Sequence, residues 1–212
     1  MSNPEVFDIH CRKCTRLADF LDELTIKHPD YHNLPVAPFG DPEARLLIVG
    51  LAPGMHGANA TGRPFTGDFA GLLLYQTLFK FGFANKMADT HINDGLELLN
   101  CRISNAVKCL PPQNKPIGQE INNCNRFLAA ELQTLPDSSL IIALGGVAHR
   151  AVIKALNLRQ TDFKFAHATE YPIKNHTLID SYHCSRYNTQ TKRLTETMFE
   201  QVFSMAKDRL SS

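Results

Sequence analysis

The chain contains no tryptophan, has no strong excess of charge of either sign, and has no long apolar run. Its formal net charge is +1, so the whole sequence offers no strong field for a polyanionic partner. A nucleic-acid partner would have to be held by a local patch of basic residues. A membrane-spanning helix needs roughly 18 uncharged apolar residues, and no stretch approaches that length, so we expect no membrane association.

The N-terminus also lacks the apolar core of a secretory signal peptide, because Pro4, Glu5 and Asp8 interrupt it. We therefore expect a soluble, intracellular protein of the cytoplasm. In a reducing compartment the six cysteines are not expected to form a disulfide framework. Metal binding is then their leading special use.

The 212 residues show no repeat, low-complexity segment or long linker, which favours a single domain over residues 1–212. Short aliphatic and β-branched runs alternate with stretches of helical periodicity. This alternation predicts an α/β fold, a single-domain three-layer α/β/α arrangement with a central, mostly parallel four-stranded sheet. The expected strands are Leu46 to Gly50, Ile103 to Val107, Leu140 to Leu144 and Thr177 to Asp180.

Helical periodicity is visible in four segments between and after these strands. In such sheets ligands bind beyond the carboxyl ends of the strands, so the residues that follow each strand are the candidates for function. The expected helices contain the face Phe69, Leu72, Leu73, Gln76 and Phe79, the segment Ile121 to Leu135, the segment Val147 to Ala155, and a closing segment Leu194 to Leu210.

A glycine-rich segment follows the first expected strand. Six of the twelve glycines lie between Gly50 and Gly71, a concentration typical of a loop that brings backbone close to a ligand. Gly57 and Gly62 have the spacing of a phosphate-binding loop, but Arg63-Pro64 stands where that loop requires Lys-Ser/Thr. An NTPase is therefore excluded.

Polar side chains stand at the ends of other expected strands. Asn105 lies among aliphatic residues, and His183 comes directly after the last expected strand. Each alone is more often structural, but Asp68, Asn105 and His183 stand near three adjacent strand ends, which indicates a binding or catalytic site.

Four cysteines have a spacing suited to chelation. Cys11 and Cys14 form a C-x2-C pair, and Cys109 is followed at longer range by Cys124. Zinc and a 4Fe–4S cluster both accept four thiolates, and the spacing does not choose between them. The remaining two, Cys101 and Cys184, are interpreted as small core residues.

Several segments together resemble the uracil-DNA glycosylase superfamily, and within it the iron–sulfur branch called family 5 or type b. The resemblance runs from Cys11 to about Leu194, with its motifs in the family's order. The segments are Gly50-Leu51-Ala52-Pro53-Gly54, Gly62-Arg63-Pro64-Phe65-Thr66-Gly67-Asp68, Ser104-Asn105-Ala106-Val107-Lys108-Cys109 and Ser181-Tyr182-His183.

The resemblance implies a monofunctional DNA repair glycosylase. Such an enzyme flips uracil, and other deaminated bases, out of DNA and hydrolyses the N-glycosidic bond to leave an abasic site. It implies DNA as partner, a monomeric enzyme, and a structural 4Fe–4S cluster in preference to zinc. The cluster ligands carried over from the family are Cys11, Cys14, Cys109 and Cys124.

The resemblance also implies roles for the pocket residues. Phe65 would stack on the flipped base and Asn105 would hydrogen-bond its edge. His183 would stabilise negative charge on the departing base, helped by the backbone of Ala52, Pro53 and Gly54. Asp68 would orient or deprotonate the attacking water, with helix capping as its competing role.

Two positions depart from the wider superfamily. Ala52 stands where classical members carry an aspartate, and family 5 is proposed to use the position of Asp68 instead. The usual His-Pro-Ser motif is His183-Cys184-Ser185 here. Phosphate contacts are expected from flanking basic residues, and Tyr187 is a candidate wedge for the vacated base stack. The expected phosphate contacts are Lys108, Lys115, Arg186, Lys192 and Arg193.

Two other functions stay open from the sequence. A noncatalytic, metal-stabilised nucleic-acid-binding module would account for the cysteines and basic residues, but not for Asp68, Asn105 and His183 together. A hydrolase of free nucleosides or small amides would need no DNA.

Overall fold

One six-stranded sheet organises the computed structural model, which describes residues 7–87 and 91–211. The strands lie in the order β1 (Phe39–Gly40), β3 (Cys101–Asn105), β2 (Leu46–Gly50), β4 (Leu140–Leu144), β6 (His176–Ser181) and β5 (Glu170–Ile173). The inner four are parallel to one another, whereas β1 and β5 pair antiparallel at the edges. The expected four-stranded parallel sheet is therefore the centre of a larger mixed sheet.

The inner strands form because their residues are aliphatic and are buried on both faces of the sheet. Leu46 and Ile48 of β2 belong to the core on one face, and Leu47 and Val49 to the core on the other. The register places Gly50 of β2 beside Asn105 of β3. This pairing brings the first two expected functional loops out at the same edge of the sheet.

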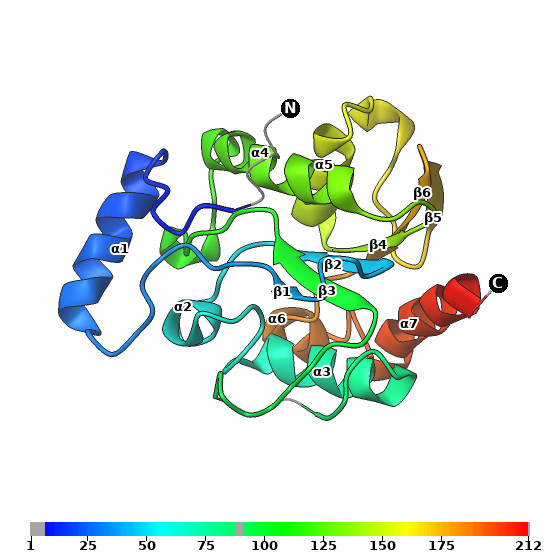
Figure 1. Ribbon diagram of the computed structural model, residues 1–212, viewed down its shortest axis with the longest axis horizontal. Coiled ribbons are helices and arrows are strands. Elements are labelled where there is room, and N and C mark those ends of the chain that lie inside the picture. The colour runs from blue at the N-terminus through cyan, green and yellow to red at the C-terminus, as the bar shows by residue number, and fades with distance from the viewer. Residues whose placement is uncertain (1–6, 88–90, 212) are drawn as a thin grey trace.

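Helices cover both faces of the sheet, which confirms the three-layer arrangement (Figure 1). On one face lie α3 (Phe69–Phe81) and α7 (Glu196–Ser211), and on the other α4 (Gly118–Thr134) and α5 (Gly146–Ala155). Among the described residues, no helix is both long and apolar enough to cross a membrane. The remaining helical segments are α1 (Thr15–Lys27), α2 (Ala58–Thr61), α6 (Arg186–Gln190) and the 3-10 turns η1 (Pro112–Asn114) and η2 (Gln160–Asp162).

The helix α3 exposes part of the face that its sequence periodicity predicts to be apolar and inward. Leu72 is 52% exposed and Phe79 is 45% exposed, whereas Leu74 and Leu78 are fully buried. Apolar residues surround most of this helix, so periodicity alone cannot identify the inward face. Asp68 caps its first turn and Gly82 ends it in the left-handed conformation.

Lys108 is buried, so the expectation that it contacts phosphate is wrong. Its side chain is 2% exposed and its Nζ lies 2.5 Å from Glu131 Oε1. Lys108 Nζ also donates to Ser104 Oγ, which itself donates to Glu131 at 2.9 Å. The partner on α4 neutralises the charge within the core, where no DNA phosphate could reach it.

Removing one partner of this pair should destabilise the fold, because the other charge is left buried. We expect Lys108→Met to lower the free energy of unfolding by about 3–5 kcal/mol. Lys108→Met combined with Glu131→Leu should recover part of that loss, since the buried carboxylate is gone, although Arg102, whose Nε lies 3.9 Å from Glu131 Oε2, loses that contact. Denaturant unfolding measures both, with the exposed Lys115→Ala as control. Equal, small effects of Lys108→Met and Lys115→Ala would contradict the buried pair.

Candidate active site

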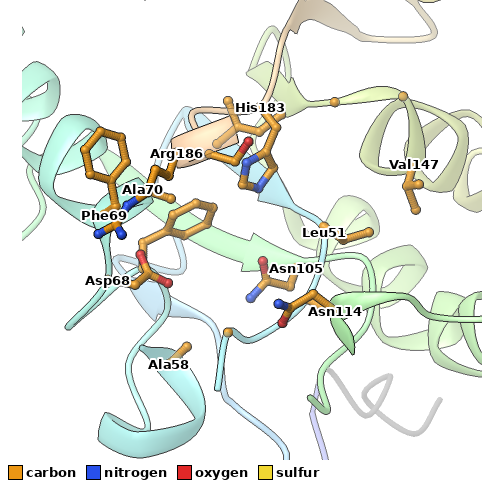
Figure 2. Close-up of a pocket in the computed structure, with 17 residues that line it drawn as sticks. Leu51, Ala58, Asp68, Phe69, Ala70, Asn105, Asn114, Val147, His183 and Arg186 are labelled. Carbon is orange, nitrogen blue, oxygen red and sulfur yellow. The ribbon is translucent and has the colours of Figure 1, made fainter. Parts of the chain in front are cut away.

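A cavity of about 480 Å³ opens where β2, β3, β4 and β6 end. Its position agrees with the rule that ligands bind beyond the carboxyl ends of parallel strands, and its volume is typical of a small-molecule site. Asp68, Asn105 and His183 all line it, so the structure brings together the three polar residues expected from separate segments. Their polar ends face the same space from three sides (Figure 2).

The missing side chain of Gly50 lets two pocket residues approach the end of β2. A Cβ atom at Gly50 would lie 2.4 Å from Asn105 Oδ1 and 2.7 Å from Phe65 Cζ. Real Cβ atoms do not tolerate such distances, so any larger residue would displace one of these side chains. Glycine at this position is therefore required by the pocket itself.

Phe65 is held in an uncommon backbone conformation beneath the cavity. Its φ is +55°, in the left-handed region that a bulky residue rarely adopts. Its ring lies nearly parallel to that of His183, with 6.0 Å between the centroids. A Cβ atom added at Gly71 would lie 1.6 Å from the Phe65 carbonyl oxygen, so the backbone at these two residues packs too closely for a side chain at residue 71. A strained residue that lines a cavity is a marker of function.

Asp68 divides its two carboxylate oxygens between the helix and the pocket. Oδ1 accepts a hydrogen bond of 2.9 Å from the Gly71 N–H and so caps α3. Oδ2 faces the backbone of Gly54 and Gly57, where added Cβ atoms would lie 3.0 and 2.4 Å away. Burial raises the pKa of Asp68 above its usual value, partly offset by the helix N–H groups. Capping and a chemical role are compatible in this geometry.

His183 is a neutral imidazole at physiological pH. Burial lowers its pKa to about 4, because desolvation disfavours the charged ring. The Asn188 amide donates 2.8 Å to the His183 carbonyl, and the adjacent Gly145 has φ +96°, a conformation that favours glycine. Neighbouring Cys184 donates from Sγ to the Ala70 carbonyl at 3.4 Å, which joins this loop to the first turn of α3.

Two buried polar atoms in this site have no partner among the described residues. They are Asn105 Oδ1 and His183 Nδ1. Buried polar atoms are normally hydrogen-bonded, and leaving one unpaired costs about 1–3 kcal/mol. Both belong to residues that line the cavity, so a ligand with a polar edge can supply the missing partners.

The glycine-rich loop forms another wall of the cavity. Ala52 and Gly54 line it as expected, whereas Pro53 is buried and does not. The sequence interpretation missed Asn114, which lines the cavity from the end of η1. Gly145, directly after β4, and Gly146, the first residue of α5, also line it. The sequence signal for this part of the cavity is a glycine pair directly after a buried strand.

The expected basic residues other than Lys108 are on the surface. Arg186 lines the cavity, and its guanidinium lies 5.4 Å from the ring centroid of Phe69. Lys115, Lys192 and Arg193 are exposed. Tyr187, the candidate wedge, is 70% exposed at the start of α6, beside the cavity.

The four expected ligand cysteines converge although they are far apart in the sequence. Cys11, Cys14, Cys109 and Cys124 line one small cavity between the N-terminal segment, the region after β3, and α4. Within the described residues, no group of three or more His, Cys, Asp or Glu side chains is arranged to hold a metal ion.

Several N–H groups point at these sulfur atoms. Hydrogen bonds to sulfur are a common feature around iron–sulfur clusters, so the surroundings fit a set of thiolate ligands. Cys101 and Cys184 are buried in the main core, as expected. The donors are Lys108 N–H to Cys124 Sγ (3.2 Å), Asn123 Nδ2 to Cys14 Sγ (3.5 Å) and Arg126 to Cys11 Sγ (3.6 Å).

Comparison with known proteins points to one family. The family described as "Uracil DNA glycosylase superfamily" matches residues 37–207. A type-5 uracil-DNA glycosylase of Thermus thermophilus is 42% identical over 203 residues, covering 93% of this chain and 92% of the relative. A type-5 uracil-DNA glycosylase of Pyrobaculum aerophilum is 38% identical, covering 94% and 89%.

More distant matches agree in fold. A type-4 uracil-DNA glycosylase of Thermotoga maritima is 31% identical, covering 68% of this chain and 62% of the relative. The crystal structure of wild-type SMUG2 from Pedobacter heparinus has a TM-score of 0.51 and 15% identity, covering 80% of this chain and 77% of that one. At this identity the likeness concerns the fold alone.

The two functions of Asp68 can be separated by stability measurements. Asp68→Ala and Asp68→Asn both lack the carboxylate charge, and Asp68→Ala should have the lower free energy of unfolding by about 1 kcal/mol, because the Gly71 N–H loses its acceptor. Asp68→Asn keeps that acceptor and removes a buried charge. The raised pKa means that this charge opposes folding at neutral pH, a cost that disappears as the pH falls through the raised value.

We therefore expect Asp68→Asn to be at least as stable as the native chain at pH 7. Denaturant unfolding of the three proteins at pH 7 measures the differences. If Asp68→Ala were as stable as Asp68→Asn, the capping bond would contribute nothing to stability.

Proposed function

This chain belongs to the uracil-DNA glycosylase superfamily, and within it to the type-5 enzymes, and from this membership we propose how its pocket performs the reaction. The enzyme removes uracil from DNA in repair by hydrolysing the N-glycosidic bond. Water supplies a hydroxyl group to the sugar and a proton to the departing base, and an abasic site remains. The convergence of Asp68, Asn105 and His183 on one cavity is the observation that carries the assignment of roles.

The base must first leave the duplex, at a cost of a few kcal/mol in lost stacking and pairing. In our proposal Phe65 replaces part of that stacking, since base–aromatic contacts are worth about 1–3 kcal/mol each. Asn105 then reads the polar edge of the base, with its unpartnered Oδ1 as acceptor and its amide nitrogen as donor. Other deaminated bases with a compatible edge are also expected to enter, and the enzyme to act as a monomer.

The departing base carries negative charge as the glycosidic bond breaks. A neutral His183 can donate a hydrogen bond to a base oxygen without itself losing a proton, and its pKa of about 4 keeps it neutral. The loop from Ala52 to Gly54 forms the facing wall and offers backbone dipoles. Both contributions are strengthened because the bound base excludes water.

The sugar side of the bond develops positive charge and needs a nucleophile. Asp68 Oδ2 faces the cavity, where it can orient water, accept its proton and offset the positive charge. Burial raises its pKa, which makes the carboxylate a stronger base. No carboxylate stands at Ala52, so Asp68 takes over this function in our proposal.

The family membership does not favour a noncatalytic binding module. A hydrolase of free nucleosides would not need the exposed basic and aromatic residues beside the cavity, such as Arg186 and Tyr187. DNA is therefore the substrate that accounts for the rim as well as the pocket.

We also propose that Cys11, Cys14, Cys109 and Cys124 hold a 4Fe–4S cluster. The shared cavity of these thiols and the N–H donors on three of their sulfur atoms support this. When bound, the cluster would act as a structural cross-link. Cys109 lies four residues after Asn105, so the cross-link would stabilise the segment that carries Asn105.

The reaction is tested on a duplex with one uracil, where abasic sites appear as alkali-sensitive strand breaks. We expect breaks at uracil, none in a matched thymine duplex, and no hydrolysis of free deoxyuridine. Asp68→Asn should slow cleavage but keep binding, since water plays little part in holding the base. His183→Ala should lose on the order of 2.7–4 kcal/mol of transition-state stabilisation.

The two variants should differ in their response to the leaving group. A uracil analogue with a more acidic base needs less help in departing, so it should partly rescue His183→Ala and not Asp68→Asn. Single-turnover rates on both substrates measure this. Equal rescue of both variants would contradict the different roles assigned to His183 and Asp68. Full activity of Asp68→Asn would leave Asp68 with a helix-capping role only.

The cluster is tested by metal content. Anaerobically purified protein should be brown and contain about four irons per chain. Cys124→Ala should lose iron, whereas Cys101→Ala, in the core away from the four thiols, should keep it. One tightly bound zinc without iron would overturn the cluster proposal.

A further inference from the structure

The loop from Gly62 to Asp68 presents both Phe65 and Asp68 to the cavity. Its conformation is not one that the local sequence favours, since Phe65 has φ +55°. A bulky residue keeps such a conformation only where surrounding contacts hold it. The question is which contacts do so.

Arg63 holds the loop from beneath. Its side chain and that of Asp94 are 3% and 2% exposed. The guanidinium donates to both carboxylate oxygens of Asp94, at 2.9 and 2.6 Å, and to the carbonyls of Ile92 and His91, at 3.3 and 3.1 Å. Its Nε donates 2.7 Å to Thr66 Oγ1. One side chain therefore joins both sides of Phe65 to the segment 91–94.

Aromatic rings complete this arrangement. The Arg63 guanidinium lies 5.2 Å from the ring centroid of Phe39 and 5.9 Å from that of Tyr75. The Tyr75 hydroxyl donates 2.7 Å to the Pro64 carbonyl. Residues 63, 64 and 66 are thus each fixed by a buried hydrogen bond, while Phe65 between them is turned toward the cavity.

We propose that Arg63 and Asp94 are positioning residues, which hold Phe65 beneath the base and Asp68 beside the sugar. Neither lines the cavity, so they act through the loop and do not touch substrate. Lysine cannot replace Arg63, because it lacks the planar fork that binds a carboxylate and two carbonyls at once. The proposal rests on the proposed function for the roles of Phe65 and Asp68.

The first test does not depend on catalysis. The chain has no tryptophan, so Phe65→Trp places a single tryptophan, which can be excited apart from the five tyrosines, at the position in question. With Arg63 intact the ring should be shielded. Adding Arg63→Lys should shift its emission to longer wavelength and increase quenching by acrylamide. Unchanged emission and quenching would overturn the proposal.

The second test is a double-mutant cycle on the single-turnover rate at saturating enzyme. Arg63→Lys should slow uracil excision by about tenfold to 100-fold, the size expected for displaced catalytic groups. In a Phe65→Ala background the same substitution should cost severalfold less, because the ring it positions is gone and only the displacement of Asp68 remains. Equal costs in both backgrounds would mean that Arg63 does not act through Phe65.

Stability is controlled separately. Val202→Ala removes buried atoms from α7, away from the loop, and should lower the melting temperature without slowing a folded enzyme. An equal loss of rate in Val202→Ala would attribute the effect to general destabilisation. Asp94→Asn keeps the side-chain shape but removes the charge, and it serves if Arg63→Lys does not fold. Asp94→Asn should reproduce both the change in fluorescence and the loss of rate expected for Arg63→Lys.

The outcomes separate this proposal from the proposed function. A native chain that leaves uracil-containing DNA intact would contradict the function, and the fluorescence test would still decide whether Arg63 positions residue 65. An active native enzyme with unchanged fluorescence and equal costs in the cycle would remove the positioning role alone.

Discussion

The pocket depends on the close approach of Asn105 and Phe65 to the bare backbone of Gly50. The parallel register of β2 and β3 places Gly50 and Asn105 side by side at the end of the sheet. The Phe65 ring reaches the same point from the following loop. A flat ligand can then lie on the ring while the amide faces its edge, and a side chain at residue 50 would separate these two functions.

The polar groups of the site are held ready in an environment with little water. Asn105 Oδ1 and His183 Nδ1 are buried without partners in the described part of the chain, so the fold bears a cost that a bound base can relieve. The same burial moves the pKa of Asp68 up and that of His183 down. One environment thus provides a stronger base and a neutral donor, the pairing that opposite sides of a glycosidic bond require.

Much of the sheet could be predicted because its inner strands are continuous aliphatic runs. β2 and β4 agree with the expected bounds, while β3 begins two residues earlier than expected. The edge strands were missed, since β1 has only two residues and β5 is mostly not buried and contains Pro172.

Side-chain environment was harder to predict, because it depends on partners far away in the chain. The sequence suggests that Lys108 is a surface charge, because it does not show that Glu131 lies beside it in the fold. The sequence likewise identifies Arg63 only as part of a loop motif, because it does not show the buried ion pair with Asp94. The meeting of Asp68, Asn105 and His183 could be predicted, since Asn105 ends β3, His183 follows β6 and the family motifs name all three.

The meeting of Cys11 and Cys14 with Cys109 and Cys124 has a consequence for biogenesis. Synthesis begins at the N-terminus, so the first pair leaves the ribosome long before the second is made. During that interval the early pair has no partners, and the cavity does not yet exist. A group held by all four thiols can therefore be fully bound only after β3 and α4 have been made.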